Sequence, residues 1–195
     1  MYSLVIVTYF PHVGPGNVKN VMAETLSEIT LIDQNKLSLV KDGALQPLLQ
    51  LLLNDDLEIK KVSVKALLQL SSMPENCLQM IKEGVAQPLL ELLYCHSLQS
   101  PTLLEQVVAT IMHLAMSTTN QQAEVEQVSF LDSEEDVYKF FSLISLTDPE
   151  IQNKILKAFQ ALCQSFYGFR IRNRLRQVST FFLKFSNFKP LMLHD

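Results

Sequence analysis

The histidines and cysteines of this chain are its first candidates for chemistry. His113 stands on the polar side of a stretch with helical spacing, and no cysteine or serine partner is evident for it. A histidine acts as a general base only beside a nucleophile or a proton donor. We therefore expect His113 to be a solvated residue of a groove. Cys95 and His96 are adjacent at the end of another such stretch, where we expect a loop without metal or thiol chemistry.

The remaining catalytic signals are absent from the sequence. Cys77, Cys95 and Cys163 form no CxxC pair, which excludes the common zinc and thioredoxin-type motifs. There is also no Gly-rich phosphate loop, G-x-S-x-G elbow or H-E-x-x-H pattern. We expect no enzymatic activity, no cofactor, no metal and no small-molecule substrate. Sparse cysteines fit a reducing compartment, so we expect buried, unreactive thiols and a cytoplasmic location.

Two charge clusters have structural interpretations. The acidic cluster comprises Asp132, Glu134, Glu135 and Asp136. Its spacing is not that of a calcium-binding EF-hand loop, and acidic residues at the start of a helix complement the helix dipole. The basic cluster comprises Arg170, Arg172, Arg174 and Arg176. On a helix these arginines spread round the axis, so we expect a solvated face; weak contact with the anionic plasma membrane is the alternative.

The overall charge argues against a nucleic-acid partner. Residues 1–164 carry 10 basic and 19 acidic side chains, whereas residues 165–195 carry six basic and one acidic. Binding to nucleic acid depends on Lys and Arg that replace counterions, and the main part of the chain has an excess of acid. No apolar run reaches the roughly 18 residues of a membrane span. The Leu-rich composition, with only five glycines, favours an all-α fold.

The elements that position these residues repeat. "KDGALQPLLQLL" begins at Lys41 and "KEGVAQPLLELL" begins at Lys82, a separation of 41 residues. A period near 40 residues is typical of stacked helical repeats. Each copy is followed by a longer stretch with helical spacing, which ends on a leucine-like residue. These ends are Ile29, Leu70, Leu114 and Leu162, at successive spacings of 41, 44 and 48 residues.

Each longer stretch predicts a helix with one buried and one polar side. Counted back from the final leucine-like residue, positions −3, −7 and −11 are mostly apolar and position −4 is always small. Positions −9, −5 and −1 are mostly polar, and we expect them to face water and to bind a partner. The predicted binding residues are Asn20, Glu24, Glu28, Lys61, Lys65, Gln69, Glu105, His113, Asn153 and Lys157.

Two shorter helices are expected before each long one. "NKLSLVKDG" and "NCLQMIKEG" predict a short first helix, and the "QPLL" segments predict a second. Gly43 and Gly84 suit the sharp turn between them, because glycine adopts positive φ without steric cost. Pro47 and Pro88 then fall near the first turn of the second helix, where a missing amide hydrogen is harmless.

Three helices in about 42 residues, with N-x-L-x-x-I-x-x-G leading into a P-L-L helix, resemble the armadillo repeat. "KDGALQPLLQLLLNDDLEIKKVSVKALLQLSS", "MIKEGVAQPLLELLYCHS" and "IMHLAMST" are similar to the armadillo region of plant U-box E3 ubiquitin ligases, in their senescence-associated subgroup. The resemblance implies a right-handed all-α solenoid of three to four repeats over residues 18–177. It also implies a scaffold that binds a protein partner on its concave surface.

The resemblance also sets the expected limits of this chain. Residues 1–17 and 178–195 do not fit the repeat, so we expect non-repeat segments there and incomplete repeats at both ends. The family's U-box, which engages the ubiquitin-conjugating enzyme, is not seen in the sequence. We therefore expect a truncated relative of the substrate-recruiting region. The alternatives are a peripheral membrane adaptor, or part of an active ligase whose U-box is supplied elsewhere.

Overall fold

The computed structural model describes the central repeats of the chain. It covers residues 33–96, 100–119 and 149–164, and also Val137, Lys139, Phe140, Ser142, Gly168, Arg172, Asn173 and Arg176. Residues 1–17, 178–195 and the acidic cluster at 132–136 lie outside the described residues, so the expected domain limits stay predictions. Within the described part every regular element is a helix, which confirms the all-α expectation.

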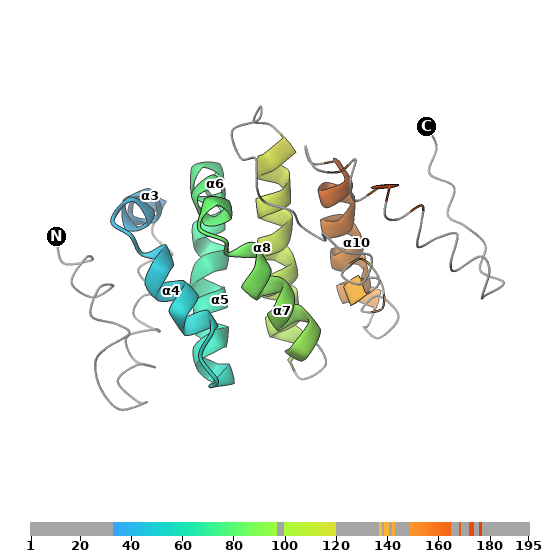
Figure 1. Cartoon of the computed structure of the whole chain (residues 1–195), viewed down its shortest axis with the longest axis horizontal. Coiled ribbons are helices and arrows are strands. Elements are labelled where there is room, and N and C mark those ends of the chain that lie inside the picture. The colour runs from blue at the N-terminus through green and yellow to red at the C-terminus, as the bar shows by residue number, and fades with distance from the viewer. Residues whose placement is uncertain are drawn as a thin grey trace.

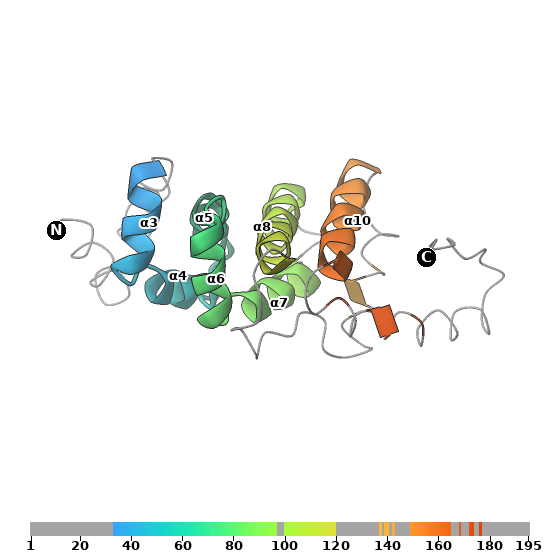
Figure 2. The ribbon, with the colours of Figure 1, turned by 90° about the horizontal axis from the view of Figure 1, so that it is seen from above.

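The helices follow the predicted order of short, short and long. The elements are α3 (Asp33–Lys41), α4 (Leu45–Leu52), α5 (Leu57–Ser71), α6 (Pro74–Lys82), α7 (Ala86–His96), α8 (Pro101–Thr119) and α10 (Pro149–Gln164). One repeat is thus α3–α4–α5, and the next is α6–α7–α8. The long helices α5, α8 and α10 lie side by side in one row, while α4 and α7 form a second row (Figure 2).

The two glycine turns are built in the same way. Gly43 has φ +86° and Gly84 has φ +77°, so both adopt the left-handed conformation that was expected. Each turn ends its helix with equivalent backbone hydrogen bonds. At the first turn Ala44 N–H donates to Leu39 C=O at 2.9 Å, and at the second turn Val85 N–H donates to Met80 C=O at 3.0 Å. This is the Schellman ending, in which glycine satisfies carbonyls that the helix leaves unpaired.

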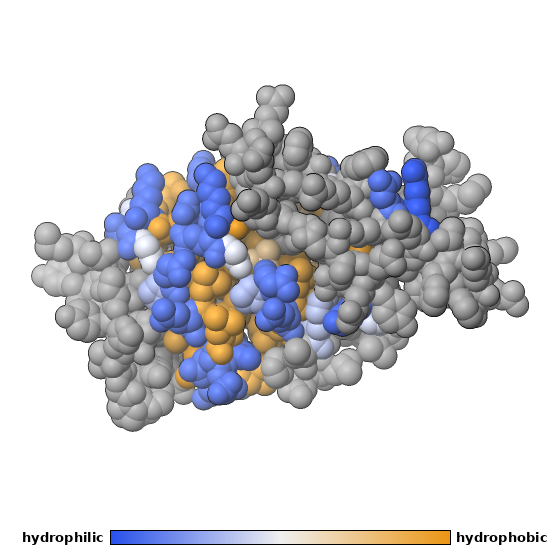
Figure 3. Space-filling view, in the orientation of Figure 1, coloured by the Kyte–Doolittle hydropathy of each residue, from blue (hydrophilic) through white to orange (hydrophobic). Residues whose placement is uncertain are grey.

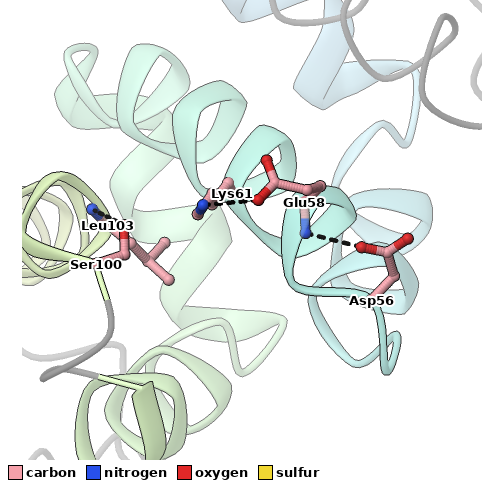
Figure 4. Close-up of polar contacts among 5 residues, drawn as sticks. All are labelled: Asp56, Glu58, Lys61, Ser100 and Leu103. Atoms are coloured by element: carbon pink, nitrogen blue, oxygen red, sulfur yellow. Dashed lines mark hydrogen bonds and ion pairs between the residues drawn. The ribbon is translucent and has the colours of Figure 1, made fainter.

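Polar caps fix where α5 and α8 begin (Figure 4). Asp56 precedes α5, and its Oδ1 accepts a 2.9 Å hydrogen bond from the backbone N–H of Glu58. Ser100 precedes α8 and accepts from the backbone N–H of Leu103 at 3.4 Å. Such caps satisfy amide groups at the start of a helix, which have no partner inside it. The caps therefore set the register of both long helices.

The core lies between the two rows of helices. The predicted stripe is buried in all three long helices, as Leu67, Ile111 and Phe159 at position −3 illustrate. Position −4 is also buried, where the small side chains of Ala66 and Ala158 let the helices approach closely. Phe140 adds an aromatic contact with Phe159, at a centroid distance of 5.7 Å. The helical period read from the sequence is therefore confirmed.

One buried asparagine joins two repeats. Asn76 is 2% exposed, and its Nδ2 donates to the backbone carbonyls of Lys36 and Leu70, both at 3.1 Å. Both carbonyls belong to the preceding repeat, the first in α3 and the second near the end of α5. A buried amide that is hydrogen-bonded on both sides fixes geometry, because an unpaired one is costly. Asn76 thus sets the position of α6 against both elements.

Candidate functional site

The long helices present one continuous face that their neighbours do not bury. On each helix it consists of positions −9, −5, −2, −1 and +2, counted from Leu70, Leu114 or Leu162. These positions form a single stripe of a helix, since they are separated by four, three, one and three residues. The residues are Lys61, Lys65, Leu68 and Gln69 on α5, with Ser72 directly after it; Glu105, Ala109, Met112, His113 and Met116 on α8; and Asn153, Lys157, Gln160, Ala161 and Gln164 on α10. We call this set the ladder face.

The three helices carry the ladder face in register. α5, α8 and α10 all run in the same direction (Figure 1). Two cross-helix contacts join nearly equal positions: Ser71 on α5 meets His113 on α8, and Glu105 on α8 meets Lys154 on α10. Equivalent residues of successive repeats therefore lie beside one another, like the rungs of a ladder.

The structure places seven of the ten predicted binding residues on this face. They are Lys61, Lys65, Gln69, Glu105, His113, Asn153 and Lys157. Asn20, Glu24 and Glu28 lie outside the described residues. Leu68, Met112 and Met116 also lie on this face but were not predicted, because only positions −9, −5 and −1 were considered. The helical period alone contains the missing signal, since these three share the stripe of the polar residues.

Positions −9, −5 and −1 of α5 and α8 reach water only in part. All of these side chains are only half-exposed there, whereas Asn153 and Lys157 on α10 are exposed. The reason is the packing of the row, in which each long helix partly covers the edge of the next. The outer atoms of these side chains therefore reach the surface, while the parts nearer the backbone are buried.

His113 is not the solvated residue that was expected. Its Nδ1 lies 2.8 Å from Oγ of Ser71, which is itself buried at 3% exposure. Burial lowers the pKa of His113 from 6.5, because the charged imidazolium loses hydration. The Ser71 hydroxyl also lies 2.8 Å from the Leu68 carbonyl. When that hydroxyl donates to the carbonyl, Nδ1–H of His113 donates to Ser71, and the imidazole is held in one tautomer.

Two charged residues of the ladder face, Lys61 and Glu105, take part in ion pairs. Nζ of Lys61 lies 2.7 Å from Oε1 of Glu58, one turn earlier on α5 (Figure 4). Glu105 pairs with Lys154 on the next long helix, and this hydrogen bond raises the pKa of Lys154. Lys154 also lies 3.4 Å from Glu150. Pairs this exposed contribute little to stability, so they can exchange with an incoming charge.

The two described thiols fit a structural role. Cys77 is fully buried, with Sγ donating to the Ser71 carbonyl at 3.0 Å, and burial raises its pKa. Burial also raises the pKa of Cys163 to about 11, against a smaller opposite effect of Arg172. A thiol with a raised pKa is a poor nucleophile at neutral pH. The side chains of Cys95 and His96 lie outside the described residues.

Neither a metal-binding cluster nor a membrane-spanning helix is present in the described part of the chain. There, no three His, Cys, Asp or Glu side chains are grouped so that they could hold a metal ion. Among the helices described, none is both long enough and apolar enough to cross a membrane.

The side of the molecule formed by α4 and α7 shows an apolar strip between polar side chains (Figure 3), and Leu53, just after α4, is 63% exposed.

Comparisons with known proteins identify the repeat. Residues 33–72, which span α3, α4 and α5, match the family model described as "Armadillo/beta-catenin-like repeat". No curated protein matches the chain. The structure of an engineered protein from the Northeast Structural Genomics Consortium superposes with a TM-score of 0.65 at 16% identity, covering 96% of this chain and 74% of that one.

Two designed proteins are also similar in structure. One is a computationally designed armadillo repeat protein for modular peptide recognition, with a TM-score of 0.53, 17% identity and 81% coverage of both chains. The other is a designed armadillo repeat protein in complex with the peptide (KR)4, with a TM-score of 0.51 and 18% identity. That match covers 91% of this chain and 81% of the designed one. Likeness at this level of identity establishes the fold.

Proposed function

We propose that this chain, an armadillo-type α-solenoid, is a scaffold that binds a segment of another protein across its ladder face. The observation that carries the proposal is the register of α5, α8 and α10. It places a continuous band of half-exposed side chains across three repeats, as the concave surfaces of repeat proteins do. The designed neighbours for peptide recognition support the same kind of ligand.

Charge reversal on the ladder face tests this proposal. The double variant Lys61→Glu/Lys65→Glu should capture much less of the partner than the wild type, or none. The reason is that like charges at an interface cost several kcal/mol. Lys41→Glu with Lys82→Glu is the matched control, since these two lysines are exposed and lie beside the glycine turns instead. Quantitative pull-downs with the full chain compare both variants with the wild type. Equal capture by all three would contradict the proposal.

A finer proposal concerns the ubiquitin pathway. The sequence resemblance to the armadillo region of plant U-box ligases supports a partner that is a ligase substrate. The chain alone should then produce no ubiquitin chains in a reaction with activating and conjugating enzymes, and the captured partner should become modified when a U-box protein is added. Chain formation that depends on this protein alone would show that it is itself a ligase.

A second candidate function is adhesion to an anionic membrane surface. Arg172 and Arg176 are exposed, and exposed basic side chains favour contact with anionic lipid. Cosedimentation with vesicles that contain phosphatidylserine, with and without Arg172→Glu and Arg176→Glu, measures this function. A membrane adaptor would lose binding in that variant, whereas a protein scaffold would keep its partner.

A further inference from the structure

The ladder face has two halves that differ in chemistry. The half nearer the beginnings of the helices carries charge, with Lys61 and Lys65 on α5 and Glu105 on α8. The half nearer their ends carries Leu68 on α5 and the apolar side chains of Met112 and Met116 on α8. Because the three helices run in the same direction, each half lines up across the row (Figure 1). A bound segment therefore meets charge on one side and apolar surface on the other.

The charged half has an excess of positive charge. Three ladder residues are basic, namely Lys61, Lys65 and Lys157, and Glu105 alone is acidic. The flanking groups Glu58, Glu150 and Lys154 reduce the excess to one positive charge. Lys61 is paired with Glu58 and Glu105 with Lys154, and both exposed pairs can exchange with a charge of the partner, so the net excess decides the sign. Complementary potential selects partners by sign, and the sign here favours carboxylates.

The half that we call apolar contains Leu68, Met112 and Met116, beside the polar residues Gln69, Ser72, His113, Gln160 and Gln164. Leu68 and Met112 are half-exposed, and Met116 is 54% exposed although most large apolar side chains of the described repeats are buried. Methionine is flexible and polarizable, and it adapts to apolar ligands of different shape. His113 lies on the same helix between the two methionines and presents a ring that burial keeps largely neutral near pH 7. The apolar half is thus suited to an apolar anchor.

We infer that the partner segment is acidic and carries an apolar anchor residue. Its carboxylates would lie against Lys61 and Lys65, and its anchor would pack on Leu68, Met112 and Met116. This inference rests on the proposed function and adds the chemistry of the ligand. The two contacts contribute differently to binding. The carboxylates select the partner by charge, and the anchor buries apolar surface.

Selection from a displayed library of random peptides tests the inference with the full chain as target. The enriched peptides should contain Asp or Glu together with Leu, Ile, Phe or Met. Resynthesised peptides should bind Lys61→Glu/Lys65→Glu at least about tenfold more weakly than the wild type, because like charges then meet. Met116→Ser should also weaken them, and its exposed position keeps the fold intact. The Lys41→Glu/Lys82→Glu control should bind like the wild type.

The other outcomes separate this inference from the proposed function. The enriched peptides could instead be rich in Lys and Arg, with binding that the ladder-face variants still alter. This outcome would overturn the inference that the partner is acidic, but it would leave the proposed scaffold function in place. Acidic peptides without an apolar residue, insensitive to Met116→Ser, would overturn the anchor. A library with no enriched peptide, or with peptides that bind all variants equally, would overturn the proposed function and this inference with it. Melting curves of every variant confirm that it is folded.

Discussion

Nδ1 of His113 and Oγ of Ser71 lie 2.8 Å apart and join α8 to α5 across a repeat boundary. The two residues are 42 positions apart in the sequence, about one repeat. Ser71 is buried and His113 is half-buried, so the contact is partly shielded from water. It belongs to the core on one side and to the ladder face on the other. Changes on the ladder face are therefore coupled to the packing of neighbouring repeats.

The stability of the protein should fall in mild acid because of His113. Its pKa in the folded chain lies below the unfolded value of 6.5. Above pH 6.5 the imidazole is neutral in both states, and the stabilisation is complete. As the pH falls from 6.5 through the lower folded pKa, the unfolded chain binds the proton more readily, and stability is lost. Urea unfolding at a series of pH values measures the effect.

His113→Gln is the control for this pH dependence, since glutamine is polar but does not titrate in this range. The variant should show a smaller loss of unfolding free energy than the wild type over the same interval. If the two pH profiles run parallel, the shifted pKa of His113 does not contribute.

A leucine pair, Leu67 on α5 and Leu53 just after α4, tests whether the predicted stripe of α5 is buried. Leu67 has no exposed surface, whereas Leu53 is 63% exposed. Leu67→Ala should lower the free energy of unfolding by about 2–5 kcal/mol, because it removes buried methyl groups and leaves a cavity. Leu53→Ala, the same chemical change at the surface, should cost about 0.5 kcal/mol or less. Denaturant titration of both variants provides the comparison, and similar losses would show that the helix phase is incorrect.

Alanine at either glycine turn should destabilise the protein through the backbone. A Cβ at Gly43 or Gly84 would meet no atom within 4 Å, so no side-chain clash contributes. Both residues have positive φ, which costs an L-residue about 1–2 kcal/mol. Asparagine tolerates this conformation better, and Gly84→Asn should therefore unfold at a higher temperature than Gly84→Ala. Equal melting temperatures would indicate that the turn relaxes to another conformation.

Asn76 should be more sensitive to charge than to the loss of its hydrogen bonds. Asn76→Ala removes two buried donors and should cost about 1–3 kcal/mol. Asn76→Asp keeps the shape but turns an acceptor toward two carbonyl oxygens, so its loss should be larger. Asn153→Ala, at an exposed position of α10, is the matched control and should be nearly neutral. Thermal melts rank the three variants, and an Asp variant as stable as the wild type would exclude this role.

The sequence predicted the elements of the fold well because the repeats share one register. The duplicated phrases placed Gly43 and Gly84 in equivalent turns, and the helical period identified the buried stripe that includes Leu67. Contacts between repeats were not predictable in the same way. The pairs Ser71–His113 and Glu105–Lys154 span 42 and 49 positions, and they depend on how neighbouring helices pack. Periodicity within one helix contains no information on that packing.

The equivalence of the two Schellman turns affects how the number of repeats can change during evolution. Both turns place glycine at the same point of the repeat, with the same hydrogen bonds on either side. A genetic exchange between Gly43 and Gly84 would thus join ends of matching geometry and add or remove one whole repeat without shifting a helix out of phase. The number of long helices in the row can vary by duplication, while each helix keeps its own side chains on the ladder face. Recombination at these glycines can therefore lengthen the ladder face, and substitution at its positions can change the chemistry that each repeat presents there.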